Sequence, residues 1–316
     1  MSINIAIIGF GNLGKACAQQ IHARSNEFNL VGIFSRRQSK QTIPLECIHD
    51  YSDKIDVALF CGGSSEDAPK LVPYLNGMGL STVDSYDNHD NIKNQTYQNA
   101  IRAASVVSGY TTVAIVGAGW DPGYLSLQRI LNKAIMPEAV HNTFYGGENG
   151  GLSMGHTNAI KGIAGVEDAH QITLPRKEAV ERATGGATID KNARHKRLCY
   201  VVAEQDKQTS IEKQIRGMEG YFKGQEVEVN FICQDEFANR FEGKHGHGGQ
   251  IISVDKNAKI NAHLEMQSNP LFTANCMIAY AKANYKMQAR KEIGVFTIDQ
   301  VPLAYLLDDA ARLCEI

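Results

Sequence analysis

The feature that most constrains the fold is a glycine-rich turn near the start of the chain, Gly9-Phe10-Gly11-Asn12-Leu13-Gly14. An apolar run at 3–8 precedes it, a helical pattern continues to about residue 25, and a second apolar run occupies 30–34. This order predicts a βαβ unit. In that setting the three glycines permit a tight turn, backbone approach to a pyrophosphate, and close packing of helix on strand. We therefore predict a dinucleotide at this turn; the alternative is a purely structural glycine turn.

The end of the second apolar run indicates which dinucleotide binds. An NAD-binding strand usually ends in Asp or Glu, which binds the ribose 2′-hydroxyl. Here the run ends in Ser35-Arg36-Arg37, and a hydroxyl with two guanidinium groups suits a 2′-phosphate. This favours NADP(H) over NAD(H), with a solvated basic loop as the alternative. We also expect Cys61-Gly62-Gly63-Ser64 to border the cofactor, although a plain turn explains that segment nearly as well.

Apolar runs alternate with helical segments through the first third of the chain. Further runs lie at 57–60, 81–83 and 112–116. Alternation of this kind predicts a Rossmann-like, doubly wound parallel sheet. We assign it to a dinucleotide-binding domain at residues 1–118.

The pattern changes after Pro122. At 226–231 and 260–266 every second residue is apolar, which is typical of strands with one buried face. We expect an α+β substrate-binding domain at residues 119–270 with an open, mostly antiparallel sheet. The remaining residues, 271–316, should form a helical segment that packs back on the dinucleotide domain, with helices from near Thr273 and over about 299–314.

Composition limits the partners of the chain. Its 316 residues have room for two domains, and a net charge of -2 gives no basic surplus for nucleic acid. Seven cysteines without a CxxC pair suit free thiols in a reducing compartment. The N-terminus has no signal-peptide pattern, and no apolar run nears the roughly 20 residues of a membrane helix. We therefore expect a cytoplasmic protein without nucleic-acid or membrane partners.

Two acidic residues follow predicted strands of the first domain. Asp84 comes directly after 81–83, and Asp121 lies in Gly119-Trp120-Asp121-Pro122-Gly123 after 112–116. Ligands of open α/β sheets bind at the carboxyl ends of the strands. Paired acids there favour a cationic group such as an ammonium. Helix capping is the alternative for the acids, and a core position is the alternative for Trp120.

Several short motifs, in order along the chain, resemble the meso-diaminopimelate dehydrogenase family. The resemblance runs from residue 3 to about 305. Each motif is short, but the set is specific. The motifs are residues 82–89 (TVDSYDNH), 119–123 (GWDPG), 153–157 (SMGHT), 173–175 (TLP), 195–197 (HKR), 226–232 (EVEVNFI), 247–249 (HGG) and 269–270 (NP).

The resemblance implies an NADP-dependent homodimer. Such an enzyme reversibly oxidises the D-centre of meso-2,6-diaminopimelate to L-2-amino-6-oxopimelate, the precursor of tetrahydrodipicolinate in lysine biosynthesis, and releases ammonia. Asp84 and Asp121 would face the reacting amino group as the catalytic residues. The acceptor of its proton stays open between either of these carboxylates, His156 and solvent. The other implied substrate contacts are Trp120, Tyr145, Met154 and Gly155 toward the D-centre, Thr173 and Arg197 at the distal carboxylate, and His247 and Asn269 at the distal L-centre.

Some positions keep other interpretations open. Met154 stands where many family members have Gln, and the loop from Gly146 to Gly151 is longer; both resemble a subgroup that accepts other D-amino acids. A broad-specificity D-amino acid dehydrogenase is therefore the first alternative, and a non-catalytic NADPH-binding regulator the second. Arg197 could be a surface charge, and His247 could be part of a flexible loop. We expect no metal, because His247 has no third ligand at useful spacing.

Overall fold

The computed structural model describes residues 2–64, 66–147, 149–241, 246–308, 311, 313 and 314. The chain divides into two compact units: unit 1 comprises Met1–Leu127 and Pro270–Ile316, and unit 2 comprises Gln128–Asn269. Unit 1 thus extends past the boundary expected at residue 118. The reason is local, since the Ala118 N–H donates to the Asp84 carbonyl at 2.7 Å and ties the following turn to the first sheet. Each unit is described by itself below.

Unit 1 contains a seven-stranded sheet in which all paired neighbours are parallel. Chain order runs outward from β1 in both directions, which is the doubly wound arrangement predicted from the sequence. The strands, in spatial order, are β14 (Gly294–Thr297), β6 (Val113–Val116), β5 (Thr82–Asp84), β4 (Val57–Phe60), β1 (Ile3–Ile8), β2 (Phe28–Ser35) and β3 (Ile43–Pro44).

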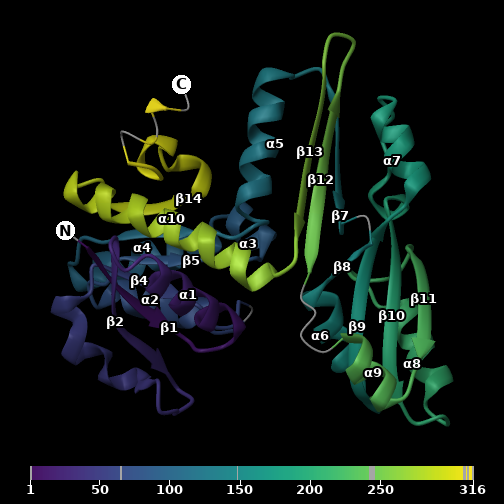
Figure 1. The fold of residues 1–316 in the computed structure, drawn as a ribbon, viewed down its shortest axis with the longest axis horizontal. Helices are drawn as coiled ribbons and strands as arrows, with labels where there is room; N and C mark the ends of the chain where they lie inside the picture. Colours follow the sequence, from purple (N-terminus) through teal and green to yellow (C-terminus); the bar gives the residue numbers. More distant parts are fainter. Residues whose placement is uncertain are drawn as a thin grey trace. The chain divides into compact units, whose positions relative to one another are not determined.

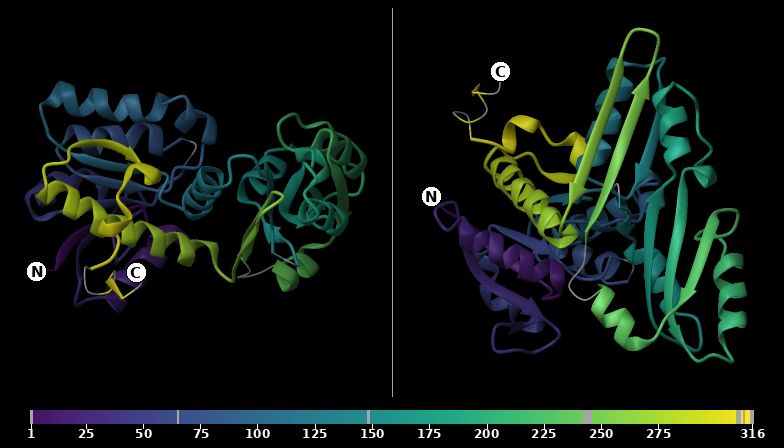
Figure 2. Two further views of the ribbon diagram at one scale, coloured as in Figure 1. Left: turned by 90° about the horizontal axis from the view of Figure 1, so that it is seen from above. Right: turned by 45° about the vertical axis from the view of Figure 1, so that its right-hand side comes forward.

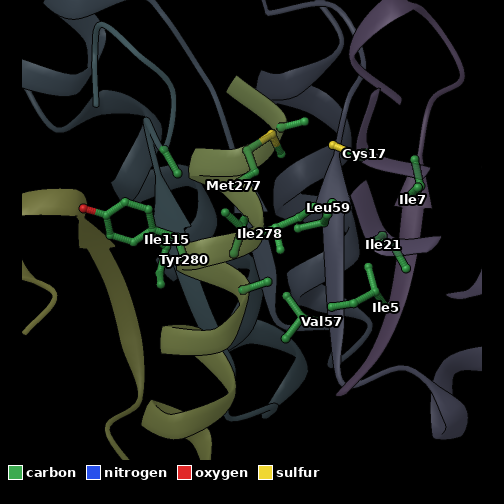
Figure 3. Packing of buried hydrophobic residues seen from close by; sticks show 14 of the residues in the cluster. Ile5, Ile7, Cys17, Ile21, Val57, Leu59, Ile115, Met277, Ile278 and Tyr280 are labelled. Carbon is green, nitrogen blue, oxygen red and sulfur yellow. The ribbon is translucent and has the colours of Figure 1, made fainter. Parts of the chain in front are cut away.

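Helices cover both faces of this sheet (Figure 2, left). Alternate side chains of each strand point to opposite faces, so β1 sends Ile5 and Ile7 to one core and Ala6 and Ile8 to the other. Figure 3 shows the first core, where Met277 and Ile278 of α10 pack beside Cys17 and Ile21 of α1. The helices of unit 1 are α1 (Asn12–Ala23) and α10 (Asn269–Ala289) on this face, α2 (Ala68–Gly77) and α4 (Thr96–Ser108) on the other, then α3 (His89–Lys93) and the 3-10 helix η1 (Leu45–Lys54). Helix α5 (Tyr124–Ile135) begins in unit 1 and continues into unit 2.

The C-terminal segment differs from its prediction in two ways. Helix α10 begins at Asn269, because Pro270 is tolerated in a first helical turn. The helix predicted over about 299–314 is wrong for its first half, which forms short 3-10 turns, η3 (Ile298–Gln300) and η4 (Leu303–Tyr305). Just before it, β14 joins the sheet beside β6, a strand that was not predicted. Pro302 disfavours helical geometry at the residue before it. Residues 309, 310 and 312 lie outside the described residues.

Unit 2 contains two sheets, of order β11-β10-β9-β8 and β13-β12-β7 (Figure 1). The predicted antiparallel pairing is confirmed except between β10 and β11, which run parallel. Helices α6 and α8 pack on one face of the four-stranded sheet and α9 on the other. The strands are β7 (Val140–Tyr145), β8 (Gly151–Leu152), β9 (Val166–Pro175), β10 (His195–Ala203), β11 (Glu226–Phe231), β12 (His247–Val254) and β13 (Lys259–Met266). The helices are α6 (Met154–Lys161), α7 (Lys177–Thr184), α8 (Gln208–Gly217), α9 (Gln234–Phe241) and the 3-10 helix η2 (Lys191–Ala193).

All seven cysteines are free. Among the helices of the described ranges, none is both long and apolar enough to cross a membrane.

Candidate functional site

The glycine turn between β1 and α1 is shaped by close backbone contacts. Gly9 has φ +103°, a conformation that L side chains rarely adopt. A Cβ at Gly14 would lie 2.1 Å from the Gly9 carbonyl oxygen, so Gly14 lets helix and strand approach. Gly11, in contrast, has open space where its Cβ would be. Gly9 and Gly14 thus meet the steric demands that the motif predicts for a tight turn and close helix–strand packing, and phosphate binding at Gly11 stays a prediction.

The predicted cofactor segments line one cavity of about 610 Å³ in unit 1. Its size suits a nucleotide. Asn12, Leu13, Gly14 and Ser64 do not line it, whereas Lys15 and Asp67, which the sequence analysis did not name, do. The predicted residues that line the cavity are Gly9, Phe10, Gly11, Ser35, Arg36, Arg37, Cys61, Gly62 and Gly63.

Charge in this cavity fits an anionic nucleotide. Three cationic side chains line the cavity, those of Lys15, Arg36 and Arg37. The carboxylate of Asp67 also lines it, so the net charge of these four groups is positive. Arg36 pairs with Asp67 at 2.7 Å, and the Ser35 hydroxyl accepts a hydrogen bond from the Arg37 N–H at 3.1 Å. The net positive charge and this ordered hydroxyl are the chemistry that a 2′-phosphate requires.

The carboxylate of Asp84 is enclosed by the fold. Its side chain is 0% exposed. One carboxylate oxygen accepts hydrogen bonds from the N–H groups of Tyr86 (2.9 Å) and Gly117 (3.2 Å), and the other accepts from the Tyr97 hydroxyl (2.9 Å). Burial raises the pKa of Asp84 to about 6. A carboxylate enclosed in this way fixes two loops and offers no surface to a substrate, which contradicts the contact expected for Asp84.

Asp87 is the exposed carboxylate of the same loop. Its N–H donates to the Ser64 hydroxyl at 3.0 Å, which ties this loop to the one after β4. Sequence reasoning passed over Asp87 because it lies three residues beyond β5. The available signal was its distance from the strand, since residues that leave a sheet edge are the ones that reach solvent.

The turn from Gly119 to Gly123 presents Asp121 beside β6. Asp121 is half-buried and accepts a hydrogen bond from the Ser126 hydroxyl at 3.3 Å. A Cβ at Gly123 would lie 1.6 Å from the Gly119 carbonyl oxygen, so the turn closes only with glycine there. Trp120 is half-buried as well, which leaves part of its ring available.

In unit 2 the structure brings Thr173 and Arg197 together. They are cross-strand partners on β9 and β10. An Arg197 terminal nitrogen donates to the Thr173 hydroxyl at 2.5 Å, and Nε donates to Gln225 Oε1 at 2.7 Å. Arg197 is only 9% exposed, and burial lowers its pKa to about 10, so it remains cationic at neutral pH. A buried guanidinium of this kind is matched to a carboxylate, and it is not a surface charge.

Two histidines near Arg197 are neutral at physiological pH. Burial and the charge of Arg197 lower the pKa of His195 to about 3 and that of His156 to about 4. His195 Nε2 accepts the Tyr145 N–H at 2.8 Å, and the two rings stack. His156 contacts Ser153 and the Tyr221 carbonyl through its two ring nitrogens. His156 is therefore a poor proton acceptor.

The remaining predicted contacts also lie in unit 2. His247 is buried, and its ring stands so close to Gly151 that a Cβ there would lie 2.8 Å from Nδ1. Met154 (51% exposed) and Gly155 form the exposed start of α6. Asn269 is half-buried at the start of α10.

Comparisons with known proteins agree with this arrangement. The family model for the diaminopimelic acid dehydrogenase C-terminal domain matches residues 119–269. The chain is 38% identical to the meso-diaminopimelate D-dehydrogenase of Corynebacterium glutamicum, over 97% of this chain and 95% of that protein. It is 35% identical to the enzyme of the same name from Ureibacillus thermosphaericus, over 96% and 95% of the two chains.

Two solved structures are similar over nearly the whole chain. One is the C. glutamicum diaminopimelate dehydrogenase in complex with diaminopimelate, with a TM-score of 0.91, 35% identity, and coverage of 99% of this chain and 98% of that one. The other is an engineered D-amino acid dehydrogenase bound to NADP+, with a TM-score of 0.86, 33% identity, and coverage of 100% and 99%.

Proposed function

The chain belongs to the diaminopimelate dehydrogenase family, and from this we propose that it is an NADP-dependent enzyme that oxidatively deaminates the D-centre of meso-2,6-diaminopimelate. The products are L-2-amino-6-oxopimelate and ammonia, and the reaction is reversible. The observation that carries the substrate assignment is the buried Arg197 bonded to Thr173, because it presents a fixed cation to a carboxylate distant from the reacting carbon. The net positive cavity on unit 1 supports NADP(H) as cofactor.

Residues of the chain bind the substrate, orient it and accept a proton from it. The bound nicotinamide supplies hydride acceptance in one direction and donation in the other. We assign binding of the reacting ammonium to Asp87 and Asp121, with Asp121 the group that accepts its proton before the C–H bond is oxidised. Asp84 acts through the loops that it fixes. Water then adds to the oxidised carbon and ammonia leaves.

The experiment is NADP+ reduction measured by absorbance with meso-, D,D- and L,L-diaminopimelate and simple D-amino acids. We expect meso-diaminopimelate to have the highest kcat/KM and the L,L isomer to be inactive. Reduction that is absent with every diaminopimelate isomer would refute the proposal.

A broad D-amino acid dehydrogenase is the second candidate. Met154 favours it, because an exposed thioether is a weak acceptor without a donor, and so holds a carboxylate poorly. Equal kcat/KM for D-alanine and meso-diaminopimelate would select this candidate. Reduction of NADP+ by none of these amino acids would favour the non-catalytic regulator.

We further infer a cytoplasmic homodimer that binds small molecules and no nucleic acid. Three large apolar side chains on α5 support the dimer, since Ile130, Leu131 and Ile135 are each about half exposed or more. A net charge of -2 disfavours nucleic acid. Light scattering after size exclusion tests the dimer, and a monomer mass at micromolar concentration would refute it.

A further inference from the structure

Gln171 is a buried amide beside the Arg197–Thr173 pair. It lies on β9 two residues before Thr173, on the same face of the strand, and is 0% exposed. Its Oε1 accepts a hydrogen bond from the Thr173 hydroxyl at 3.3 Å. Its Nε2 has no hydrogen-bond partner within the described residues. A buried donor without a partner lowers the stability of the folded state, so a role in ligand binding would account for its presence.

The backbone of Gln171 is hydrogen-bonded to the start of α6 through both its N–H and its carbonyl group. Its N–H donates to the Thr157 hydroxyl at 3.0 Å, and its carbonyl accepts the Ser153 N–H at 3.0 Å. Both partners flank or belong to α6. These bonds fix the backbone of Gln171, whereas rotation of its terminal amide breaks neither of them.

A half-turn of that amide would change what Thr173 can do. Nε2 would then donate to the Thr173 hydroxyl oxygen, which already accepts from Arg197. A hydroxyl oxygen has two acceptor sites and one hydrogen. With both acceptor sites filled by Arg197 and Gln171, its hydrogen must point to a third group, and the group that completes the network is an acceptor such as a carboxylate.

We propose that Gln171 is a positioning residue that makes Thr173 an obligate hydrogen-bond donor to a substrate carboxylate held by Arg197. Without a carboxylate the Thr173 hydroxyl donates to Gln171 Oε1, the hydrogen bond that this structure has. With a carboxylate, the amide turns, Nε2 takes the place of Oε1 at the Thr173 hydroxyl, and Thr173 and Arg197 both donate to the ligand. The inference rests on the proposed function, because it takes the ligand to be an amino acid with a second carboxylate.

The test is a double-mutant cycle between Gln171→Met and Thr173→Val. If Gln171 acts through the Thr173 hydroxyl, Gln171→Met should raise KM for meso-diaminopimelate by about tenfold while kcat changes little. In the Thr173→Val background the same change should have almost no effect. Gln171→Glu should raise KM further, by about a hundredfold, because a carboxylate accepts the hydroxyl hydrogen permanently and repels the ligand.

Gln98→Met is the matched control. Gln98 is also a buried amide with one unpartnered side-chain atom, but it lies in unit 1 and its Nε2 donates to the Ile92 carbonyl. This variant should lose stability without a change in KM for meso-diaminopimelate. NADP+ affinity, followed by fluorescence, should be unchanged in the Gln171 variants.

The outcomes separate this inference from the proposed function. If the wild-type protein oxidises meso-diaminopimelate and Gln171→Met retains its KM, or raises it equally with and without the Thr173 hydroxyl, the inference is overturned alone. If the wild-type protein does not oxidise meso-diaminopimelate, the proposed function fails whatever Gln171 does.

Discussion

Replacing Asp84 by asparagine tests the structural role of a carboxylate that the fold encloses completely. The replacement keeps the side-chain volume and removes the charge. The asparagine oxygen still accepts the N–H groups of Tyr86 and Gly117, and its NH2 donates to the Tyr97 hydroxyl, which can also accept. We expect the variant to fold.

The magnitude follows from the pKa of Asp84. Burial raises it from 3.8 to about 6. Because the folded pKa lies above the unfolded one, the folded state binds the proton more tightly, and wild-type stability falls as pH rises through this window. At about 1.4 kcal/mol per pKa unit, the ionised carboxylate costs the folded state about 3 kcal/mol above pH 6. The asparagine variant has no such term.

The assay is urea unfolding of both proteins between about pH 4 and pH 7. The free energy of unfolding of the variant minus that of the wild type should increase by about 2.4 kcal/mol over this range, because the unfolded carboxyl is already partly ionised at pH 4. Other titrating groups cancel in the difference. A constant offset of about 1 kcal/mol from the altered hydrogen bonds does not affect the slope.

Turnover of the Asp84 and Asp87 variants tests which of the two carboxylates acts in the reaction. Asp84→Asn should keep kcat/KM within about tenfold of the wild type, whereas Asp87→Asn should lower it by about a hundredfold or more, because Asp84 is buried and Asp87 is exposed. Two results together would refute the reasoning: a difference in unfolding free energy between variant and wild type that does not change with pH, and loss of turnover in Asp84→Asn. They would show that Asp84 takes part in the reaction.

Three further predictions concern other groups. Gly14→Ala should destabilise the protein by about 3 kcal/mol and abolish NADPH fluorescence enhancement, because its Cβ overlaps the Gly9 carbonyl, whereas Gly11→Ala should fold normally; equal melting temperatures would contradict this. Arg197→Met should raise KM for meso-diaminopimelate about a hundredfold and leave NADPH affinity unchanged; an unaltered KM would exclude Arg197 from binding. Because burial lowers the pKa of His195 to about 3, stability should fall as pH drops below 6.5, and His195→Asn should reduce that slope in urea unfolding; an unchanged slope would show that His195 charges freely in the fold.

Local patterns accounted for much of the fold. The apolar runs predicted β1, β2 and β4 within two residues of their ends, because period and composition are properties of neighbouring residues. The parallel pairing of β10 with β11 was not predicted, since the same alternation serves either direction. Strand β14 was missed because its four residues become a strand only beside β6.

The predicted substrate contacts also differ in how far the sequence could indicate them. Resemblance to a family named Thr173 and Arg197, and the register of β9 and β10 brings them into contact. Resemblance also named Asp84, but the structure encloses that carboxylate between Tyr97, thirteen residues later, and Gly117, after the next strand. The groups that enclose Asp84 come from other segments of the chain, so the residues next to Asp84 do not reveal them.

The sequence by itself determined the glycine turn, the basic residues after β2, the doubly wound order of the first domain and the family, because each depends on residue type at short range. Long-range contacts determine which acids are buried, hold Arg197 between Thr173 and Gln225, and leave Gln171 Nε2 without a partner among the residues that the structure describes. These properties arise from desolvation and from contacts between segments distant in the chain, and both exist only once the sheets have formed.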